Sequence, residues 1–485
     1  MLRGYRVQIQ PSMRFLSDEQ IQEIHLASLD ILERTGVVVH HPEVIELLLS
    51  EGCSMRSQNT VRIPSFLVEQ ALESIPCRIA LYGRSGGKRL LVEDRKSYWG
   101  TGSDTPFIID SFSGCRRQTT LQDIENAARV VDACENLDFL MCMGVAHELP
   151  QAIADKYHFV AMAANSSKPI VYTASSLANM EDIYRMAVMI AGSEEALRER
   201  NFIVHYTEPI SPLIHPRGSL EKLLFCIDRG IPVIYTSATT TSQNGPATLA
   251  GALALSVARM LSGLLIGQLR RRGAPMIVTF HGSSMDPRTA IHTYTSPEHV
   301  ILQAAARDMA AYYRIPTWGR AGCTDSKVLD QQAAFEAGCE IFMQALSGEN
   351  LIHDVGYLES GLTASLDSIV MCDEFIGVAK RMIQGFELSE ETLALDVIHE
   401  VGPEGHFLTH DHTVRHYRKE TWIPRLIDRS SYQQWEEKGR TTLFDRINRR
   451  VREILESHEV VTLPASLLEE LNRLAARETG SGPPI

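Results

Sequence analysis

The chain has 485 residues, of which 44% are hydrophobic and 22% are charged, as is usual for a globular protein with a large core. Sixty acidic residues outnumber 47 basic ones and give a net charge of −13, so a non-specific nucleic-acid binder, which needs a basic face, is excluded. The same composition excludes disordered, collagen-like and disulfide-scaffold proteins.

Several local features bear on the compartment. The nine cysteines stand singly, with no CxxC pair, which favours free thiols in a reducing compartment. The N-terminal segment has no signal-peptide pattern. The apolar stretch Thr248–Leu269 has the length of a membrane span, but Arg259 near its middle favours a buried or interface helix. We therefore expect a cytoplasmic protein.

The first part of the chain predicts a small region of helices and short strands. Ser17, followed by acidic residues, is expected to cap a helix whose apolar stripe runs from Ile21 to Leu32. Further helices and hairpins are expected at Glu43–Ser50, Ser54–Pro64, Phe66–Ile75 and around Ser85-Gly86-Gly87.

From Lys96 onward, short apolar strands alternate with helices. The expected strands are Lys96–Asp104, Phe139–Ala146, Pro169–Ser175, Phe202–Pro209, Pro232–Ala238, Pro275–Gly282, Pro316–Asp325 and Leu351–Leu358. Such alternation indicates parallel pairing, and eight strand–helix units close into a (β/α)8 TIM barrel more naturally than they form an open sheet. No glycine-rich phosphate motif follows the first strand, which counts against a dinucleotide-binding fold.

The tail breaks this alternation at Leu388 and is expected to be helical, with a frayed end at Arg477–Ile485. The predicted α/β chain thus has three parts: an N-terminal helical and β region over 1–95, the barrel over 96–387, and a C-terminal helical extension over 388–485.

Polar and aromatic residues recur where the expected strands end, which is where ligands bind in such barrels. The candidate site residues are Tyr98, Trp99, Tyr206, Glu208, Phe280, His281, Arg320, Asp325, His353 and Tyr357. Rings and carboxylates that converge at one mouth suit a cation held by ring faces and negative charge. Any single histidine or ring is more often a hydrogen-bonded or packing residue, so the hypothesis depends on the convergence.

A histidine-rich segment lies in the tail, with His406, His410, His412 and His416. His412 and His416 have the i, i+4 spacing of a metal-binding helix, but no glutamate stands between them as in HExxH. The first expected strand also lacks the HxH that a metal-dependent amidohydrolase would need. The sequence favours a structural or interface role for these histidines and predicts no metal site.

Four segments resemble the trimethylamine:corrinoid protein methyltransferase family: HYTEPISPL (His205–Leu213), GCTDSKVLDQQAAFEA (Gly322–Ala337), HDVGYLESGLTASLD (His353–Asp367) and GHFLTHDHTVRHYRKETWIPRLIDR (Gly405–Arg429). The similarity runs from about Phe15 to Trp435. It implies a (β/α)8 barrel that presents a methylated amine to a separate corrinoid protein, whose Co(I) accepts the methyl group. The corrinoid (cobamide) cofactor would then be supplied by that partner, with none bound tightly by this chain.

One departure from the family pattern concerns the substrate. Family members that act on trimethylamine carry pyrrolysine, and no such residue occurs in these 485 positions. The chain therefore resembles the non-pyrrolysine branch, whose relatives act on quaternary amines such as glycine betaine. A quaternary ammonium already bears its positive charge and leaves as a neutral amine, so it needs no covalent activation, whereas a tertiary amine is normally protonated.

The leading hypothesis is a cobamide-dependent methyltransferase for a quaternary amine, with glycine betaine as the simplest choice. Rings rather than carboxylates would contact the ammonium, because charge leaves the substrate during transfer and a strong anionic clamp would oppose the reaction. His281, His353 or Arg320 would donate to a substrate carboxylate. The alternatives are a metal-dependent barrel hydrolase and a non-catalytic quaternary-amine binding protein. The expected partners are the corrinoid protein, the small amine and further copies of the chain, with no nucleic acid and no membrane.

Overall fold

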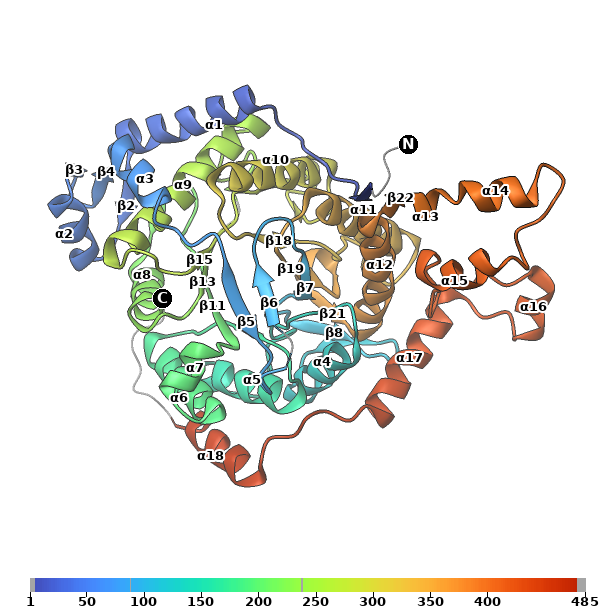
Figure 1. Cartoon of the computed structure of the whole chain (residues 1–485). Helices are drawn as coiled ribbons and strands as arrows, with labels where there is room; N and C mark the ends of the chain where they lie inside the picture. The colour runs from blue at the N-terminus through green and yellow to red at the C-terminus, as the bar shows by residue number, and fades with distance from the viewer. Residues whose placement is uncertain (1–4, 88, 237–238, 478–485) are drawn as a thin grey trace.

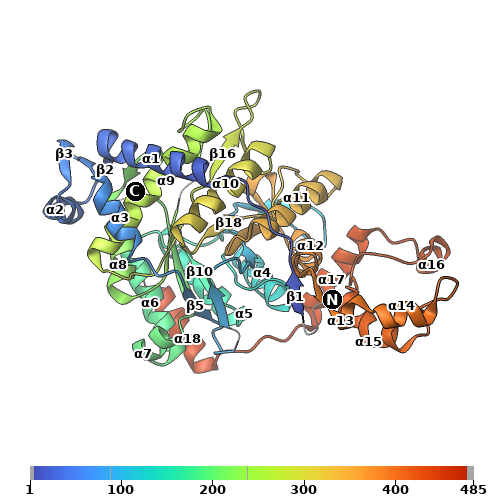
Figure 2. The same cartoon turned by 45° about the horizontal axis from the view of Figure 1, so that its top comes forward.

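The computed structural model describes residues 5–87, 89–236 and 239–477. Short strands gather at the centre of the molecule and helices surround them, while a helical arm projects to one side (Figures 1 and 2).

Eight parallel segments form the centre, and we call them the strand ring. They are β7 (Tyr98–Thr101), residues 139–140, β10 (Ile170–Tyr172), β11 (Ile203–Thr207), β13 (Val233–Tyr235), β15 (Met276–Ile277), β18 (Trp318–Arg320) and β19 (Leu351–Val355). Parallel bridges join each segment to the next along the chain, and β19 pairs in parallel with β7. The expected α/β alternation is confirmed. The last two residues of the expected strand 232–238 lie outside the described residues.

Helices follow the strands in turn: α4 (Leu121–Ala133), α5 (Gln151–Asn165), α6 (Leu177–Ala191), α7 (Glu194–Glu199), α8 (Arg217–Arg229), α9 (Leu249–Arg270), α10 (Pro297–Tyr313), α11 (Gln331–Ser347) and α12 (Leu366–Gln384). Side chains alternate between two cores, as the period of two in a strand requires. On β13, Val233 and Tyr235 join the large core beneath the helices, whereas Ile234 joins the small core inside the ring.

Helix α9 is, among the described residues, the one helix long and apolar enough to cross a membrane. It packs instead against α1, α2, α3 and α10, and most of its side chains are buried inside the protein. The expectation of an internal helix is therefore confirmed, and Arg259 on this helix is fully buried.

The N-terminal region packs on α9 and is joined to the ring through a shared sheet. Its elements are α1 (Asp18–Asp30), a one-turn extension (Ile31–Thr35), β2 (Val37–Val39), α2 (Pro42–Ser50), β3 (Ser54–Ser57), β4 (Thr60–Arg62) and α3 (Ser65–Leu72). Ser17 caps α1 in a capping box with Gln20, as predicted. β12 (Ile214–His215), which comes from the loop after β11, pairs with β2 and so attaches this region to the ring.

A hairpin of β5 (Ile79–Tyr82) and β6 (Arg89–Val92) packs against one end of the strand ring (Figure 1). Its apolar side chains share the small inner core with Phe139, Val204 and Trp318. Because the hairpin covers the end where the strands begin, the opposite end, where the strands finish, carries the polar side chains.

Very short strands lie in the loops that follow the ring strands, and periodicity could not reveal them at this length. They are β8 (Phe107–Ile109), β9 (Arg116–Gln118), β14 (Thr239–Thr240), β16 (Gly282–Met285), β17 (His292–Thr293), β20 (Tyr357–Leu358) and β21 (Thr363–Ser365), with a short 3-10 turn at Glu359–Gly361.

The C-terminal extension is helical, as expected, and has two parts. β22 (Phe386–Ser389), α13 (Glu390–Leu393), α14 (Leu395–Val401), α15 (Asp411–Glu420) and α16 (Tyr432–Glu437) lead into the projecting arm (Figures 1 and 2). α17 (Leu443–Ser457) then packs on α4 and α12, and α18 (Ala465–Ala475) packs on α5 and α6. β22 pairs with β1 (Arg6–Ile9), which links the first and third predicted parts of the chain. The division at 95 and 387 stays a prediction, and 478–485 of the expected frayed end lies outside the described residues.

The inner core predicts a large cost for truncating the hairpin. Leu81 on β5 is fully buried in that core, so Leu81→Ala should lower the free energy of unfolding by about 2–5 kcal/mol. Leu408→Ala is the matched control, because Leu408 is 80% exposed and its loss should change stability by less than about 0.5 kcal/mol. Denaturant unfolding measures both, and equal small effects would contradict the hairpin's place in the core.

Candidate functional site

Three aromatic rings from β11, β18 and β19 lie near one another inside the strand ring. Trp318 and His353 are stacked, with ring centroids 4.3 Å apart and planes inclined by 30°. The ring of Tyr206 lies 6.0 Å from that of Trp318 and 6.5 Å from that of His353. The pairing of β18 with β19 places Trp318 beside Leu351 and Arg320 beside His353, so the two stacked rings come from positions two residues apart in depth.

Arg320 is the buried cation of the site. One of its terminal nitrogens donates to the carbonyl oxygen of Tyr294 at 3.0 Å and to Nε2 of His299 at 2.6 Å. The guanidinium also stands 3.8 Å above the centre of the Tyr294 ring, a cation–π contact. Its Nε faces a carboxylate oxygen of Asp354 at 3.9 Å. These contacts hold the side chain in place on every side.

His353 and Asp354 form a buried pair that needs one proton between them. Nδ1 of His353 donates to the carbonyl oxygen of Gly319 at 2.6 Å, and its Nε2 lies 3.1 Å from Oδ1 of Asp354. Burial lowers the pKa of His353 and raises that of Asp354, while the charge of each partner, and of Arg320 for Asp354, opposes the change. Both ring nitrogens of His353 are therefore already engaged.

Tyr357 joins the last ring strand to the loop after the first. Its hydroxyl donates to the carbonyl oxygen of Ser103, and its ring centre lies 6.3 Å from that of Tyr294. The Tyr357 ring can approach this closely only because residue 102 is a glycine: a Cβ there would lie 2.2 Å from the ring. A bulkier residue at 102 would push Tyr357 away from the mouth.

Two carboxylates remain open to solvent yet are surrounded by enough protein to change their titration. Burial raises the pKa of Asp104 to about 6, with Asp155 and Glu208 adding to the effect and a bond from Ser103 opposing it. Burial also raises the pKa of Glu208, which accepts a hydrogen bond from the Tyr206 hydroxyl and is partly compensated by Arg259. The mouth therefore gains negative charge as the pH rises.

His281 lies between β15 and β16 and is buried. Burial, followed by the charge of Arg320, holds the pKa of His281 well below its usual range, so the ring is neutral. Nδ1 pairs with the hydroxyl of Thr279. Within the described part of the chain no hydrogen bond to Nε2 is found, so this nitrogen is available to a ligand.

The structure gathers six of the ten predicted residues at the end of the ring where the strands finish: Tyr206, Glu208, His281, Arg320, His353 and Tyr357. Asp325 lies beside them and accepts hydrogen bonds from the backbone of Tyr294 and from the hydroxyls of Thr295 and Ser360. It ties two loops together, which is a positioning role.

Three predicted residues lie elsewhere, and their expected place at the mouth is corrected. The Tyr98 hydroxyl exchanges hydrogen bonds with the backbone of Leu91 on the hairpin, at the opposite end of the ring. Trp99 and Phe280 belong to the core beneath the helices, where the Phe280 ring packs on Tyr313 at 5.5 Å. All three belong to the packed interior.

The candidate set leaves out five residues that lie at or beside the site: Asp104, Arg259, Tyr294, Trp318 and Asp354. Asp104 closes an expected strand, and Asp354 follows His353, so their position was a usable signal. Tyr294 lies in a loop and Arg259 in the middle of a helix, and nothing local distinguishes them.

Comparison with known proteins places the chain. A family model described as trimethylamine methyltransferase matches residues 3–483. The chain belongs to the trimethylamine methyltransferase family. Within it, a trimethylamine methyltransferase MttB of Desulfitobacterium hafniense is 30% identical over 94% of this chain and 92% of its own length. A glycine betaine methyltransferase from another strain of that organism is 28% identical over 97% and 98%.

The fold is also like that of a solved structure. The monomethylamine methyltransferase MtmB of Methanosarcina barkeri superposes with a TM-score of 0.54, over 92% of this chain and 89% of that one, at 11% identity. At that identity the likeness concerns the fold alone.

The raised pKa of Asp104 predicts a pH dependence of cation binding. Below about pH 6 the carboxyl is neutral, and above it an extra negative charge faces the mouth. The affinity for tetramethylammonium, whose charge does not titrate, should therefore rise about threefold to fourfold between pH 5 and 7, as the ionisation of a group some 4 Å away in water would give. Asp104→Asn should flatten this rise and the exposed control Glu404→Gln should keep it; calorimetric titration of both decides.

Proposed function

We propose that this family member removes a methyl group from a quaternary amine, with glycine betaine as the first candidate, and transfers it to the Co(I) centre of a separate corrinoid protein. The main support is the cluster of aromatic side chains, and of carboxylates with raised pKa, around Tyr206, His353 and Tyr357 at one end of the strand ring. The absence of pyrrolysine from the sequence and the similarity to a glycine betaine methyltransferase support the same substrate class.

We infer that the strand ring is the closed (β/α)8 TIM barrel that the sequence predicts. The pairing of β19 with β7 supports this, since it connects the last ring strand to the first. In such a barrel the finishing ends of the strands form the binding face. The methyl acceptor would approach this face, because the hairpin β5–β6 covers the other one.

In this reaction the chain has to bind the amine and orient it for attack. The partner corrinoid supplies the nucleophile, and the electron pair of the broken C–N bond stays with the departing neutral amine. Tyr206 and Tyr357 offer ring faces to the ammonium, each contact being worth about 0.5–2 kcal/mol. Fixing the amine with one N-methyl toward the open face removes the entropy cost of alignment.

His281 is the best placed donor for a substrate carboxylate. Arg320 already bonds Tyr294 and His299, and both nitrogens of His353 are engaged. In the tautomer whose Nδ1 accepts from the Thr279 hydroxyl, neutral His281 carries its proton on Nε2 and can donate it. This narrows the three donors that the sequence suggested to one.

The remaining expectations stay proposals. A cytoplasmic protein with no tightly bound cofactor of its own, a corrinoid protein as partner and a homo-oligomeric state agree with the family membership. A metal-dependent hydrolase and a binding protein that has lost transfer are the competing functions.

The donor role of His281 makes a specific prediction. His281→Ala should raise KM for glycine betaine by about tenfold to a hundredfold, the loss of one charge-assisted hydrogen bond. Choline, which has the same ammonium and no carboxylate, is the matched ligand, and its Kd should change by less than about twofold. Equal weakening of both ligands would mean that His281 shapes the mouth without binding the carboxylate.

The substrate class is tested by offering glycine betaine, carnitine, proline betaine and trimethylamine to the purified protein with reduced cobalamin or a corrinoid protein. Loss of Co(I) absorbance is expected with a betaine and not with trimethylamine. Binding without Co(I) loss, when a competent acceptor is present, would favour the binding-protein alternative. Metal-dependent hydrolysis of an amide or ester substrate would favour the hydrolase, and rapid turnover of trimethylamine would refute the quaternary-amine assignment.

A further inference from the structure

We propose that the projecting arm binds one divalent transition-metal ion of the zinc class between α13 and α15, through Glu391, His412 and His416. These residues lie in the C-terminal extension, outside the strand ring and its mouth. The inference stands independently of the methyltransferase proposal.

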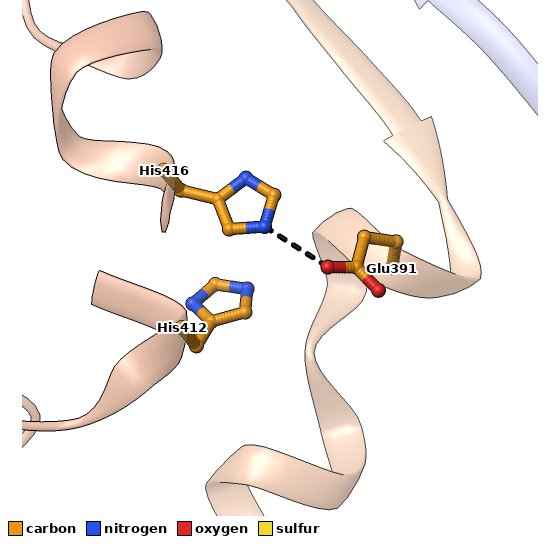
Figure 3. Close-up of side chains that lie close together, drawn as sticks. All are labelled: Glu391, His412 and His416. Atoms are coloured by element: carbon orange, nitrogen blue, oxygen red, sulfur yellow. Dashed lines mark hydrogen bonds and ion pairs between the residues drawn. The ribbon is translucent and has the colours of Figure 1, made fainter. Parts of the chain in front are cut away.

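The three side chains already point at one another (Figure 3). One ligand atom of each lies within 4.8 Å of the other two, and Nε2 of His416 is 3.0 Å from Oε1 of Glu391. The imidazoles of His412 and His416, one helical turn apart on α15, have centroids 4.3 Å apart. Ligands at about 2.0–2.2 Å from a tetrahedral zinc are separated by about 3.3–3.6 Å, so small side-chain rotations suffice.

His412 supplies a second, independent indication. Its Nε2 has essentially no solvent contact, and it has no hydrogen-bond partner among residues 5–87, 89–236 and 239–477. A covered polar atom without a partner costs free energy, and a metal bond would satisfy it. Figure 3 shows this ring turned toward Glu391 and His416.

The other two histidines of the segment have different places. The side chain of His410 caps α15 by accepting from the backbone of His412 at 3.1 Å, which fixes the start of the helix that carries both ligands. His406 is exposed on the preceding loop. The carboxylate ligand comes from a separate helix, α13, which is why the spacing within α15 alone predicted no metal.

The donor set indicates the kind of ion. Two imidazoles and one carboxylate suit zinc, cobalt or nickel better than calcium or magnesium, which take oxygen ligands. Three protein ligands leave the fourth position to water. Arg415 lies 3.9 Å from Glu391, but its side chain is exposed and can turn into solvent when the ion binds.

The helices of the arm have little apolar packing, so a metal ion would stabilise them. Helices α13, α14 and α15 contain no buried residue, so apolar packing contributes little to their stability. Glu391 lies two residues after the end of β22, which is paired with β1 and thereby attached to the body. An ion shared by Glu391 and α15 would fix α15 to this anchored segment, as structural metals do in small units with little core.

The test uses the full chain, produced without a histidine tag and stripped with a chelator. Zinc titration with elemental analysis should give one ion per chain for the wild type and for the control His406→Ala. His412→Ala and Glu391→Gln should weaken zinc binding by at least about tenfold, a loss that even supporting residues of metal sites produce. Cobalt substitution should give the visible absorption of a tetrahedral ion in the wild type and in His406→Ala, but not in the two ligand variants.

A second measurement reports on the arm itself. Zinc should slow hydrogen exchange over residues 390–420 in the wild type and in His406→Ala, and should leave the two ligand variants unchanged. Absence of stoichiometric zinc in the wild type, or binding that is equal in all four proteins, would overturn the proposal. Glu391→Gln keeps the volume of the side chain, so a loss of binding there is not an effect of misfolding, which circular dichroism of each variant checks.

Discussion

The parallel pairing of β19 with β7 is the contact on which the site depends. It places the end of the last ring strand beside the loop after the first, residues that are far apart in the chain. Only then can the hydroxyl of Tyr357 donate to Ser103 and its ring lie over Gly102. Asp104, on the same loop, and Asp354, on β19, consequently belong to one electrostatic environment that includes Tyr357.

Placing several charges at the ends of buried strands costs free energy, and the structure offsets this cost by pairing each charged group with polar or oppositely charged neighbours. Arg320 is bonded to Tyr294 and His299 and faces Asp354, and Nε2 of His353 lies 3.1 Å from the same carboxylate. Removing one member of such a network would leave its partner buried and unsatisfied, which is far more destabilising than the net value of the pair. The network therefore also makes the mouth rigid, as orientation of a small substrate requires.

The alternation of strands and helices could be predicted because it is local: Ser17 caps its helix through its own neighbours, and strand residues carry their own apolar pattern. The direction of each side chain was partly predictable. Tyr98 and Trp99 are adjacent in β7, so the two members of this pair must point to opposite faces. Which member faces inward depends on register, and only the fold decides that. Tyr294, Arg259 and Glu391 reach their partners from loops and helices, and no periodicity could indicate them.

The electrostatics of the mouth agree with a reaction in which the substrate loses its charge. Three carboxylates there have a weakened negative charge. Glu208 accepts a hydrogen bond from Tyr206, Asp354 lies 3.1 Å from Nε2 of His353, and Asp104 ionises only above about pH 6. A bare ion pair would stabilise the cationic ground state more than a transition state whose charge is leaving, and would slow transfer. Ring faces attract the ammonium less strongly and lose less as it becomes neutral. The combination of Tyr206 and Tyr357 with weakened anions would therefore suit the proposed quaternary amine, because it would not hold the charge too tightly for the methyl group to depart.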